Sequence, residues 1–151
     1  MKFLLVITLS LLSSVAFAED FGLGVILGDP SGLSVKMKMD ESHSLDGAFA
    51  YSGGKHHGMQ FHADYLRDRA RSWHTSGGGP INMYYGIGGR IISYDDTKKS
   101  VVALGPRGSL GLNYDFFNPN VEIFGELALV LEVAPSVDAD IDFGVGARIR
   151  F

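Results

Sequence analysis

The side chains of this sequence that could perform chemistry stand in small groups along the chain. His56 and His57 are adjacent, beside Gly53-Gly54-Lys55, and neighbouring histidines can bind a transition metal. No third ligand stands at helical or strand spacing from them. We therefore interpret the pair as loop residues and predict neither a metal site nor a cofactor.

A second group has the residue types of a hydrolytic site. His62 and Asp64 are two positions apart, so in an extended segment they share a face, where the carboxylate could orient the imidazole as a base. Three serines are candidate nucleophiles. They are Ser34, Ser44 and Ser109.

The largest group consists of charged residues that alternate with apolar ones. Its basic members are Lys36, Lys38, Arg90, Arg107, Arg148 and Arg150. Its acidic members are Asp46, Asp64, Glu122, Glu126, Glu132 and Asp142. Such a set is typical either of an ion path or catalytic carboxylate cluster, or of a polar interior filled by paired charges. The elements that hold these residues decide between the two interpretations.

Those elements are β-strands, because apolar and polar residues alternate along the chain with a period of two. In the last segment Ile141, Phe143, Val145, Ala147, Ile149 and Phe151 occupy one face. The same pattern predicts eight strands, at 21–28, 33–39, 45–51, 59–65, 81–91, 102–114, 121–133 and 141–151. Gly, Pro, Asn and Asp dominate most of the connections, which favours turns. The connection at 68–80 is the least regular, and Pro106 within a strand predicts a bulge at Gly105-Pro106.

The composition of the two faces predicts which one points inward. The apolar face has no Asp, Glu, Lys or Arg, and the other combines charges with Gly and Ala, which leave room for long side chains. In an eight-stranded barrel the lumen is just wide enough to be filled by side chains. An arginine facing lipid at the bilayer centre would cost about 2–4 kcal/mol. We predict an antiparallel up-and-down transmembrane barrel, with an exported lipocalin-like soluble barrel as the alternative.

The first residues predict export. A positive start at Lys2 precedes an apolar run, and Ala16-Phe17-Ala18 has the form of a cleavage site. We expect residues 1–18 to be a signal peptide and 19–151 to be the barrel domain. The chain of 151 residues has no cysteine and a net charge of −4, which excludes a disulfide scaffold and disfavours a nucleic-acid partner.

Several motifs resemble a family of small bacterial outer-membrane β-barrels, known as a domain of unknown function in proteobacteria and spirochaetes. They are His62-Ala63-Asp64-Tyr65-Leu66, Tyr84-Tyr85-Gly86-Ile87-Gly88-Gly89-Arg90, Gly111-Leu112-Asn113-Tyr114, Glu122-Ile123-Phe124-Gly125-Glu126-Leu127 and Gly144-Val145-Gly146-Ala147-Arg148. The architecture is similar to OmpA and OmpX. The resemblance implies an integral outer-membrane location, a membrane-lipid partner and no established activity. The terminal Phe151 is similar to the signal that outer-membrane assembly machinery recognises.

With both termini in the periplasm, an aromatic girdle is expected from Phe21, Tyr65, Tyr114 and Phe151. Strand pairing predicts the interior contacts Glu126 with Arg148, Glu126 with Arg107, Lys36 with Asp46, and Asp46 with Asp64. We interpret this balanced set of charges as a plugged lumen and expect a monomer with a structural or surface role. A lipid A-modifying enzyme is the other alternative, disfavoured because the predicted lipid face has no Ser, His or carboxylate.

Overall fold

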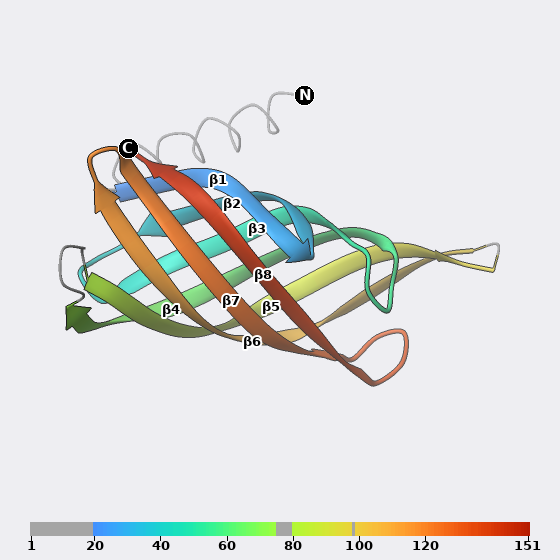
Figure 1. Cartoon of the computed structure of the whole chain (residues 1–151). Helices are drawn as coiled ribbons and strands as arrows, with labels where there is room; N and C mark the ends of the chain where they lie inside the picture. Colours follow the sequence, from blue (N-terminus) through green and yellow to red (C-terminus); the bar gives the residue numbers. More distant parts are fainter. Residues whose placement is uncertain (1–19, 75–79, 98) are drawn as a thin grey trace, which may run out of the picture.

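A computed structural model describes residues 20–74, 80–97 and 99–151, so the expected signal peptide lies outside the described residues. Eight strands form a closed barrel in chain order. They are β1 (Asp20–Asp29), β2 (Ser31–Lys38), β3 (His43–Ser52), β4 (Gly58–His74), β5 (Pro80–Asp96), β6 (Lys99–Phe117), β7 (Asn120–Glu132) and β8 (Asp138–Arg150). The predicted all-β, eight-stranded antiparallel barrel is confirmed (Figure 1). No helix among these residues is long and apolar enough to cross a membrane.

The barrel closes where the first strand meets the last. Leu23 pairs with Ile149 in antiparallel register, and Phe151 N–H donates to the Phe21 carbonyl at 2.8 Å. Each of the eight strands therefore has a neighbour on both sides, and the barrel has no edge strand. Both described ends of the chain therefore lie at the same end of the barrel (Figure 1).

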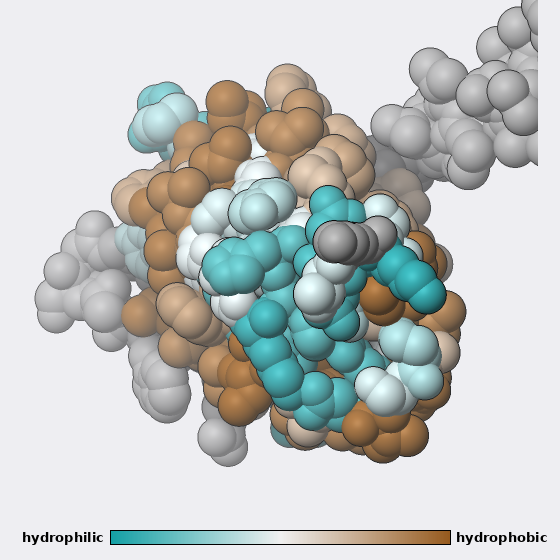
Figure 2. Space-filling model, turned by 90° about the vertical axis from the view of Figure 1, so that its right-hand side faces the viewer, coloured by the Kyte–Doolittle hydropathy of each residue, from teal (hydrophilic) through white to brown (hydrophobic). Residues whose placement is uncertain are grey.

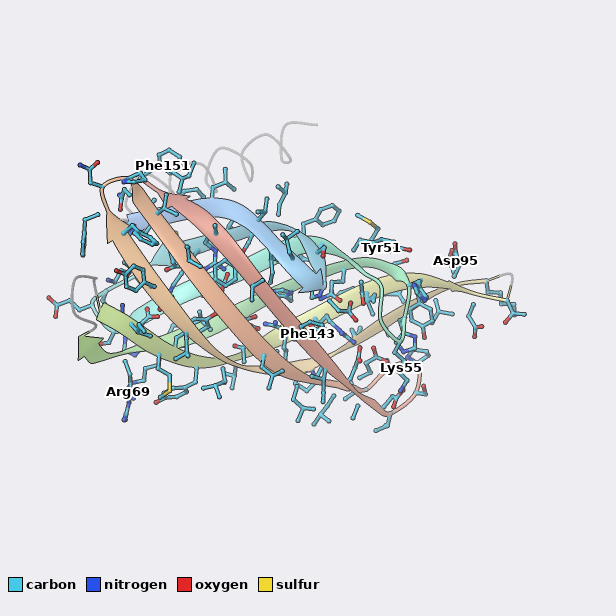
Figure 3. All side chains as sticks on the ribbon, in the orientation of Figure 1. Tyr51, Lys55, Arg69, Asp95, Phe143 and Phe151 are labelled. Carbon is cyan, nitrogen blue, oxygen red and sulfur yellow. The ribbon has the colours of Figure 1, made fainter. Side chains whose placement is uncertain are left out.

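The alternation of residues separates the two surfaces of the barrel wall. Along β7, Leu127, Leu129 and Leu131 are exposed on the outside, while Glu126 and Glu132 are buried inside. Figure 3 shows the outward side chains radiating from the wall. Apolar residues also point inward where the lumen has space. The buried ones are Ile26, Leu66, Tyr84, Ile92, Phe124 and Val130.

The strands β4, β5 and β6 are longer than the sequence pattern predicts. The expected connection at 68–80 is wrong, because β4 continues to His74 and β5 begins at Pro80, with a register shift between Arg69 and Trp73. This extension puts the exposed Arg67 and Arg69 on the outside, so the expectation of an outer face without charge is wrong at this end. Figure 3 shows Arg69 pointing away from the wall.

Pro106 lies where the ladder between β6 and β7 is interrupted. Pairing with β5 continues through Pro106, opposite Gly89, so the predicted bulge does not affect that side. On the β7 side, regular pairing stops at Arg107 opposite Val130, and an isolated bridge joins Leu104 to Ala134 with the register shifted by one residue. Because proline has no N–H, the chain tolerates it where the ladder is already interrupted.

One tight turn requires glycine. Gly28 is the second-last residue of β1. Its φ of 144° is a conformation that residues with a Cβ rarely adopt. A Cβ at this position would collide with the carbonyl of Phe143 on the neighbouring strand β8. The β1–β2 connection can therefore follow β8 closely.

Candidate functional site: the charged lumen

Three arginines from β5, β6 and β8 organise the interior. The side chains of Arg90, Arg107 and Arg148 are only 1–2% exposed. A buried guanidinium needs carboxylate and hydrogen-bonding partners, because its removal from water is costly. Each of the three has at least two carboxylate partners, which come from different strands.

Arg148 lies nearest the end of the barrel that carries the termini. Its Nη1 is 2.6 Å from Glu122 Oε1, its Nη2 is 2.7 Å from Asp46 Oδ1, and it also donates to the Ser34 hydroxyl. The guanidinium stacks 3.7 Å from the centre of the Phe124 ring. Arg148 thus connects β8 to β2, β3 and β7 across the lumen.

Arg107 and Arg90 follow along the barrel and share a carboxylate. Arg107 pairs with Asp64 and lies 2.6 Å from Glu126. Arg90 binds Asp142 at 2.6 Å, and the other oxygen of Asp142 lies 3.4 Å from Arg107 Nε. Asp142 therefore links two arginines.

The mouth at the termini holds the more accessible cations. Lys36 Nζ is 3.4 Å from both Asp68 and Glu122. Arg150 lies 2.9 Å from Asp115. These side chains line a cavity of about 100 Å³ together with Arg148. Lys38 lines the same cavity, but it is exposed and has no ion pair with any described residue, so it is not part of the buried network.

The structure corrects one of the predicted pairs. Arg148 lies opposite Glu122, and Glu126 lies opposite Gly144, because β8 begins at Asp138 and the hairpin is tighter than expected. The predicted contact of Arg107 with Glu126 is present, although Arg107 lies opposite Val130 in the ladder.

The register around β3 agrees with the sequence interpretation, but the Lys36 side chain forms ion pairs with residues other than the predicted one. Asp46 lies opposite both Lys36 and Asp64, as predicted. The Lys36 ammonium nevertheless turns to Asp68 and Glu122, and Arg148 takes Asp46.

The buried charges are not balanced, contrary to the prediction. Among the described residues, six buried carboxylates face three buried guanidinium groups. The carboxylates are Asp46, Asp64, Glu122, Glu126, Glu132 and Asp142. Lys36 and Arg150 at the mouth add two further cations, whose side chains are 11% and 16% exposed. Because each guanidinium compensates more than one carboxylate, the loss of a cation should cost more than the loss of an acid.

Several residues of the network were not predicted. Asp68 and Asp140 were assigned to connections, and they became partners of Lys36 and Arg90 because the strands extend further. The Tyr84 hydroxyl donates to Glu126 at 3.1 Å, and a Cβ at Gly111 would collide with the Tyr84 ring. The inward glycines thus make room for aromatic rings as well as for charged chains.

His62 is the histidine that lies inside the barrel among the residues whose side chains the structure describes. His62 is buried beside Asp64 and Glu126, and its Nδ1 has no hydrogen-bond partner among the described residues. Of the candidate serines, Ser34 binds Arg148 and Ser44 binds Asp68, while the Ser109 hydroxyl has no partner in the described part of the chain. No hydroxyl hydrogen-bonds His62 in the described part of the chain, so the residues present do not form a nucleophilic triad.

His43 is the first residue of β3, at the end of the barrel that carries the termini, and its side chain lies on the outside. Its Nδ1 lies 3.0 Å from Asp40, and its ring stacks on the outward Tyr65. The expectation of an outer face without His is therefore wrong here, because β3 begins two residues earlier than predicted. In the turn before it, the Ser42 amide donates to Asp40, and with His43 it holds the pKa of Asp40 below the usual 3.8.

The four predicted girdle aromatics occupy different positions in their strands. Phe21 and Phe151 are joined by main-chain hydrogen bonds, and Tyr114 lies near the end of β6 beside Phe116. Tyr65 lies near the middle of β4, not at its end, because that strand is longer than predicted. Phe116 is a rim aromatic that the sequence interpretation assigned to a turn.

No protein-family model and no curated protein matches the sequence. Among solved structures, the chain is similar to the crystal structure of the N-terminal β-barrel domain of Pseudomonas aeruginosa OprF, with a TM-score of 0.60 and 13% identity. The similarity covers 87% of this chain and 96% of that one. At this identity the similarity concerns the fold alone. The chain therefore has the eight-stranded fold of the OprF barrel domain, and its interior is held together by buried ion pairs.

Proposed function

We propose that the chain is an integral outer-membrane β-barrel with a plugged lumen, and that both of its termini face the periplasm. The observation that carries this proposal is the inverted distribution of residues. Outward side chains such as Ile87, Val145 and Phe143 are 59–74% exposed, while nine charged side chains inside the barrel are buried. In water such an apolar surface would drive association, whereas lipid stabilises it.

The end of the barrel opposite the termini, here called the loop end, supports the proposal. Polar residues gather over the mouth, and hydrophobic residues surround it (Figure 2). At this end the hairpin of β5 and β6 projects beyond the neighbouring strands, because β5 pairs with β6 as far as Asp96 and Lys99, whereas β6 pairs with β7 only from Arg107 (Figure 1). Outer-membrane barrels combine short periplasmic turns with longer outer loops.

Arg67 and Arg69 are compatible with this location. They lie on the outside toward the end that carries the termini, where the cost of an arginine falls to about 0–1 kcal/mol because lipid phosphates and water are within reach. A soluble lipocalin-like barrel would instead keep its large apolar side chains inside.

The burial of the lumen charges supports a role without transport. A water-filled channel would expose Arg90, Arg107 and Arg148, which are almost completely buried. The protein then acts through its presence in the membrane and its outer loops, as a monomer and without enzymatic activity. At His43, the one outward histidine paired with a carboxylate, no hydroxyl among the described residues hydrogen-bonds the ring.

The test combines fractionation, electrophoresis and conductance. We expect the protein in the outer-membrane fraction, a change in gel migration on heating, and no stable single-channel current in planar bilayers. Native protein recovered from the periplasm without detergent would contradict the membrane location. A large, stable current would contradict the plugged lumen.

A second measurement tests the partner implied by the last strand. Deletion of Phe151 removes the main-chain hydrogen bonds to Phe21 and the terminal aromatic residue. We expect slower insertion in cells and unchanged refolding in detergent, because only assembly in cells uses the recognition signal. Equal defects in both settings would indicate that Phe151 acts through stability alone.

A further inference from the structure

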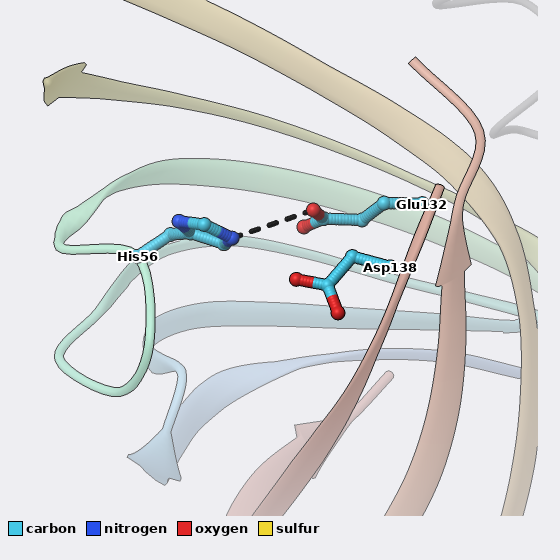
Figure 4. A group of neighbouring side chains, drawn as sticks. All are labelled: His56, Glu132 and Asp138. Carbon is cyan, nitrogen blue, oxygen red and sulfur yellow. Dashed lines mark ion pairs between the residues drawn. The ribbon is translucent and has the colours of Figure 1, made fainter. Parts of the chain in front are cut away.

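Three side chains that lie in or beside two connections between strands meet at the loop end of the barrel. His56 lies in the connection between β3 and β4, Glu132 is the last residue of β7, and Asp138 is the first residue of β8. Figure 4 shows the imidazole facing the Glu132 carboxylate, with Asp138 beside them.

The spacing of their atoms corresponds to that of metal ligands. His56 Nε2 and Glu132 Oε2 are 3.4 Å apart, and one ligand atom of each of the three residues lies within 4.8 Å of the others. Two ligands at about 2.0–2.1 Å from a tetrahedral Zn²⁺ are separated by about 3.3–3.4 Å. The first pair already has this separation, and only the accessible Asp138 has to move closer.

The imidazole of His56 is held in place without a hydrogen-bond partner. Its ring stacks on Tyr94 with 4.1 Å between centres, and Nε2 is buried without a hydrogen bond to any described residue. Buried polar atoms in proteins normally have a partner. Nε2 is thus within ion-pair distance of Glu132 Oε2 but makes no hydrogen bond to it, and a metal ion between the two atoms would bind both.

The Glu132 carboxylate is also oriented as a metal ligand would be. Its side chain is 4% exposed, and Oε1 accepts a hydrogen bond from Arg90 at 2.7 Å. The second oxygen, Oε2, is turned toward His56. A ligand whose other oxygen is fixed by a neighbouring group is typical of metal sites, because such outer partners set the ligand's direction.

Two cations balance the carboxylates of this group. Arg90 compensates Glu132, and the exposed Lys55 ammonium is bound to Asp138. A divalent ion would replace Lys55, which is at the surface and free to swing into water. Lys55 therefore competes with the metal.

We propose that His56, Glu132 and Asp138 form a binding site for a divalent transition metal of the Zn²⁺ type. One imidazole and two carboxylates are ligands that such borderline ions accept, and they leave a fourth position for water. The other group with suitable atoms, His62 with Asp64 and Glu126, is disfavoured because Arg107 pairs with both of its carboxylates.

The test measures Zn²⁺ binding by titration calorimetry on the full barrel refolded in detergent, with Co²⁺ absorption to report coordination. We expect one ion per chain. His56→Ala and Glu132→Gln should each weaken binding by at least about 10- to 100-fold. His57→Ala is the matched control, since His57 is the exposed neighbour outside the group, and it should bind like the unaltered chain.

The variant Lys55→Gln distinguishes a metal site from a loss of structure, because an unfolded variant could not bind Zn²⁺ more tightly. Because it frees Asp138 and removes a competing cation, binding should become tighter. Heat-shift electrophoresis verifies that each variant is folded. The proposal is overturned if the folded, unaltered chain does not bind Zn²⁺, if His57→Ala weakens binding as much as His56→Ala, or if Lys55→Gln leaves binding unchanged or weaker.

Discussion

Replacing Arg148 by methionine tests the ion-paired interior most directly. The change keeps much of the side-chain volume against Phe124 but leaves Asp46 and Glu122 without their guanidinium. Removal of one partner from a buried ion pair costs about 3–5 kcal/mol, because the remaining charge stays buried. With a urea dependence of about 2 kcal/mol per M, the unfolding midpoint should fall by about 1.5–2.5 M.

Two controls separate this effect from a general response to lost charge. Asp46→Asn retains the shape and leaves Arg148 with Glu122 and Ser34, so it should cost only about 1 kcal/mol. Lys38→Met removes an exposed cation without an ion pair to any described residue and should change stability by no more than about 0.5 kcal/mol. The assay is urea unfolding of the refolded barrel, followed by circular dichroism. If Arg148→Met behaves like Lys38→Met, the reasoning about uncompensated buried carboxylates is refuted.

The remaining predictions concern the interior of the wall, its outer face and a turn. Gly111→Ala should destabilise the barrel by about 1–3 kcal/mol, because its Cβ meets an aromatic ring, whereas Gly108→Ala has open space and should be tolerated in the same urea assay. Ile87→Arg on the outer face should cost about 2–4 kcal/mol in lipid vesicles, and Val137→Arg in the outer loop should cost little; equal effects would argue against lipid contact. The lowered pKa of Asp40 means that its stabilising contribution is present above its unfolded pKa near 3.8 and is lost as the pH falls through the folded value. Asp40→Asn should therefore flatten the dependence of stability on pH below about 4, and an unaltered dependence would show that this carboxylate has no role.

The alternation of residues was sufficient to predict the barrel, because a period of two defines both the strands and their faces. It could not determine strand length where polar residues continue the pattern, so the part of β4 from Asp68 onward was assigned to a connection. The sequence also could not determine the pairing register of β8, because the length of the preceding turn sets that register. Pro135 and Ser136 suit a longer turn as well as the observed one, after which β8 begins at Asp138. The contacts of Lys36 cross the lumen, and no local pattern encodes which acid a long side chain reaches.

The closure of β1 against β8 has a consequence for how the chain folds. The residues that pair at this seam are separated by almost the whole described chain, so their contact forms late and the loop that it closes is long. Until then, the growing sheet has two open edges at which strands of other molecules can pair. A product that ends before β8 would keep those edges permanently. We therefore expect truncated chains to aggregate or to be degraded, whereas full-length chains become resistant to proteolysis in one late step.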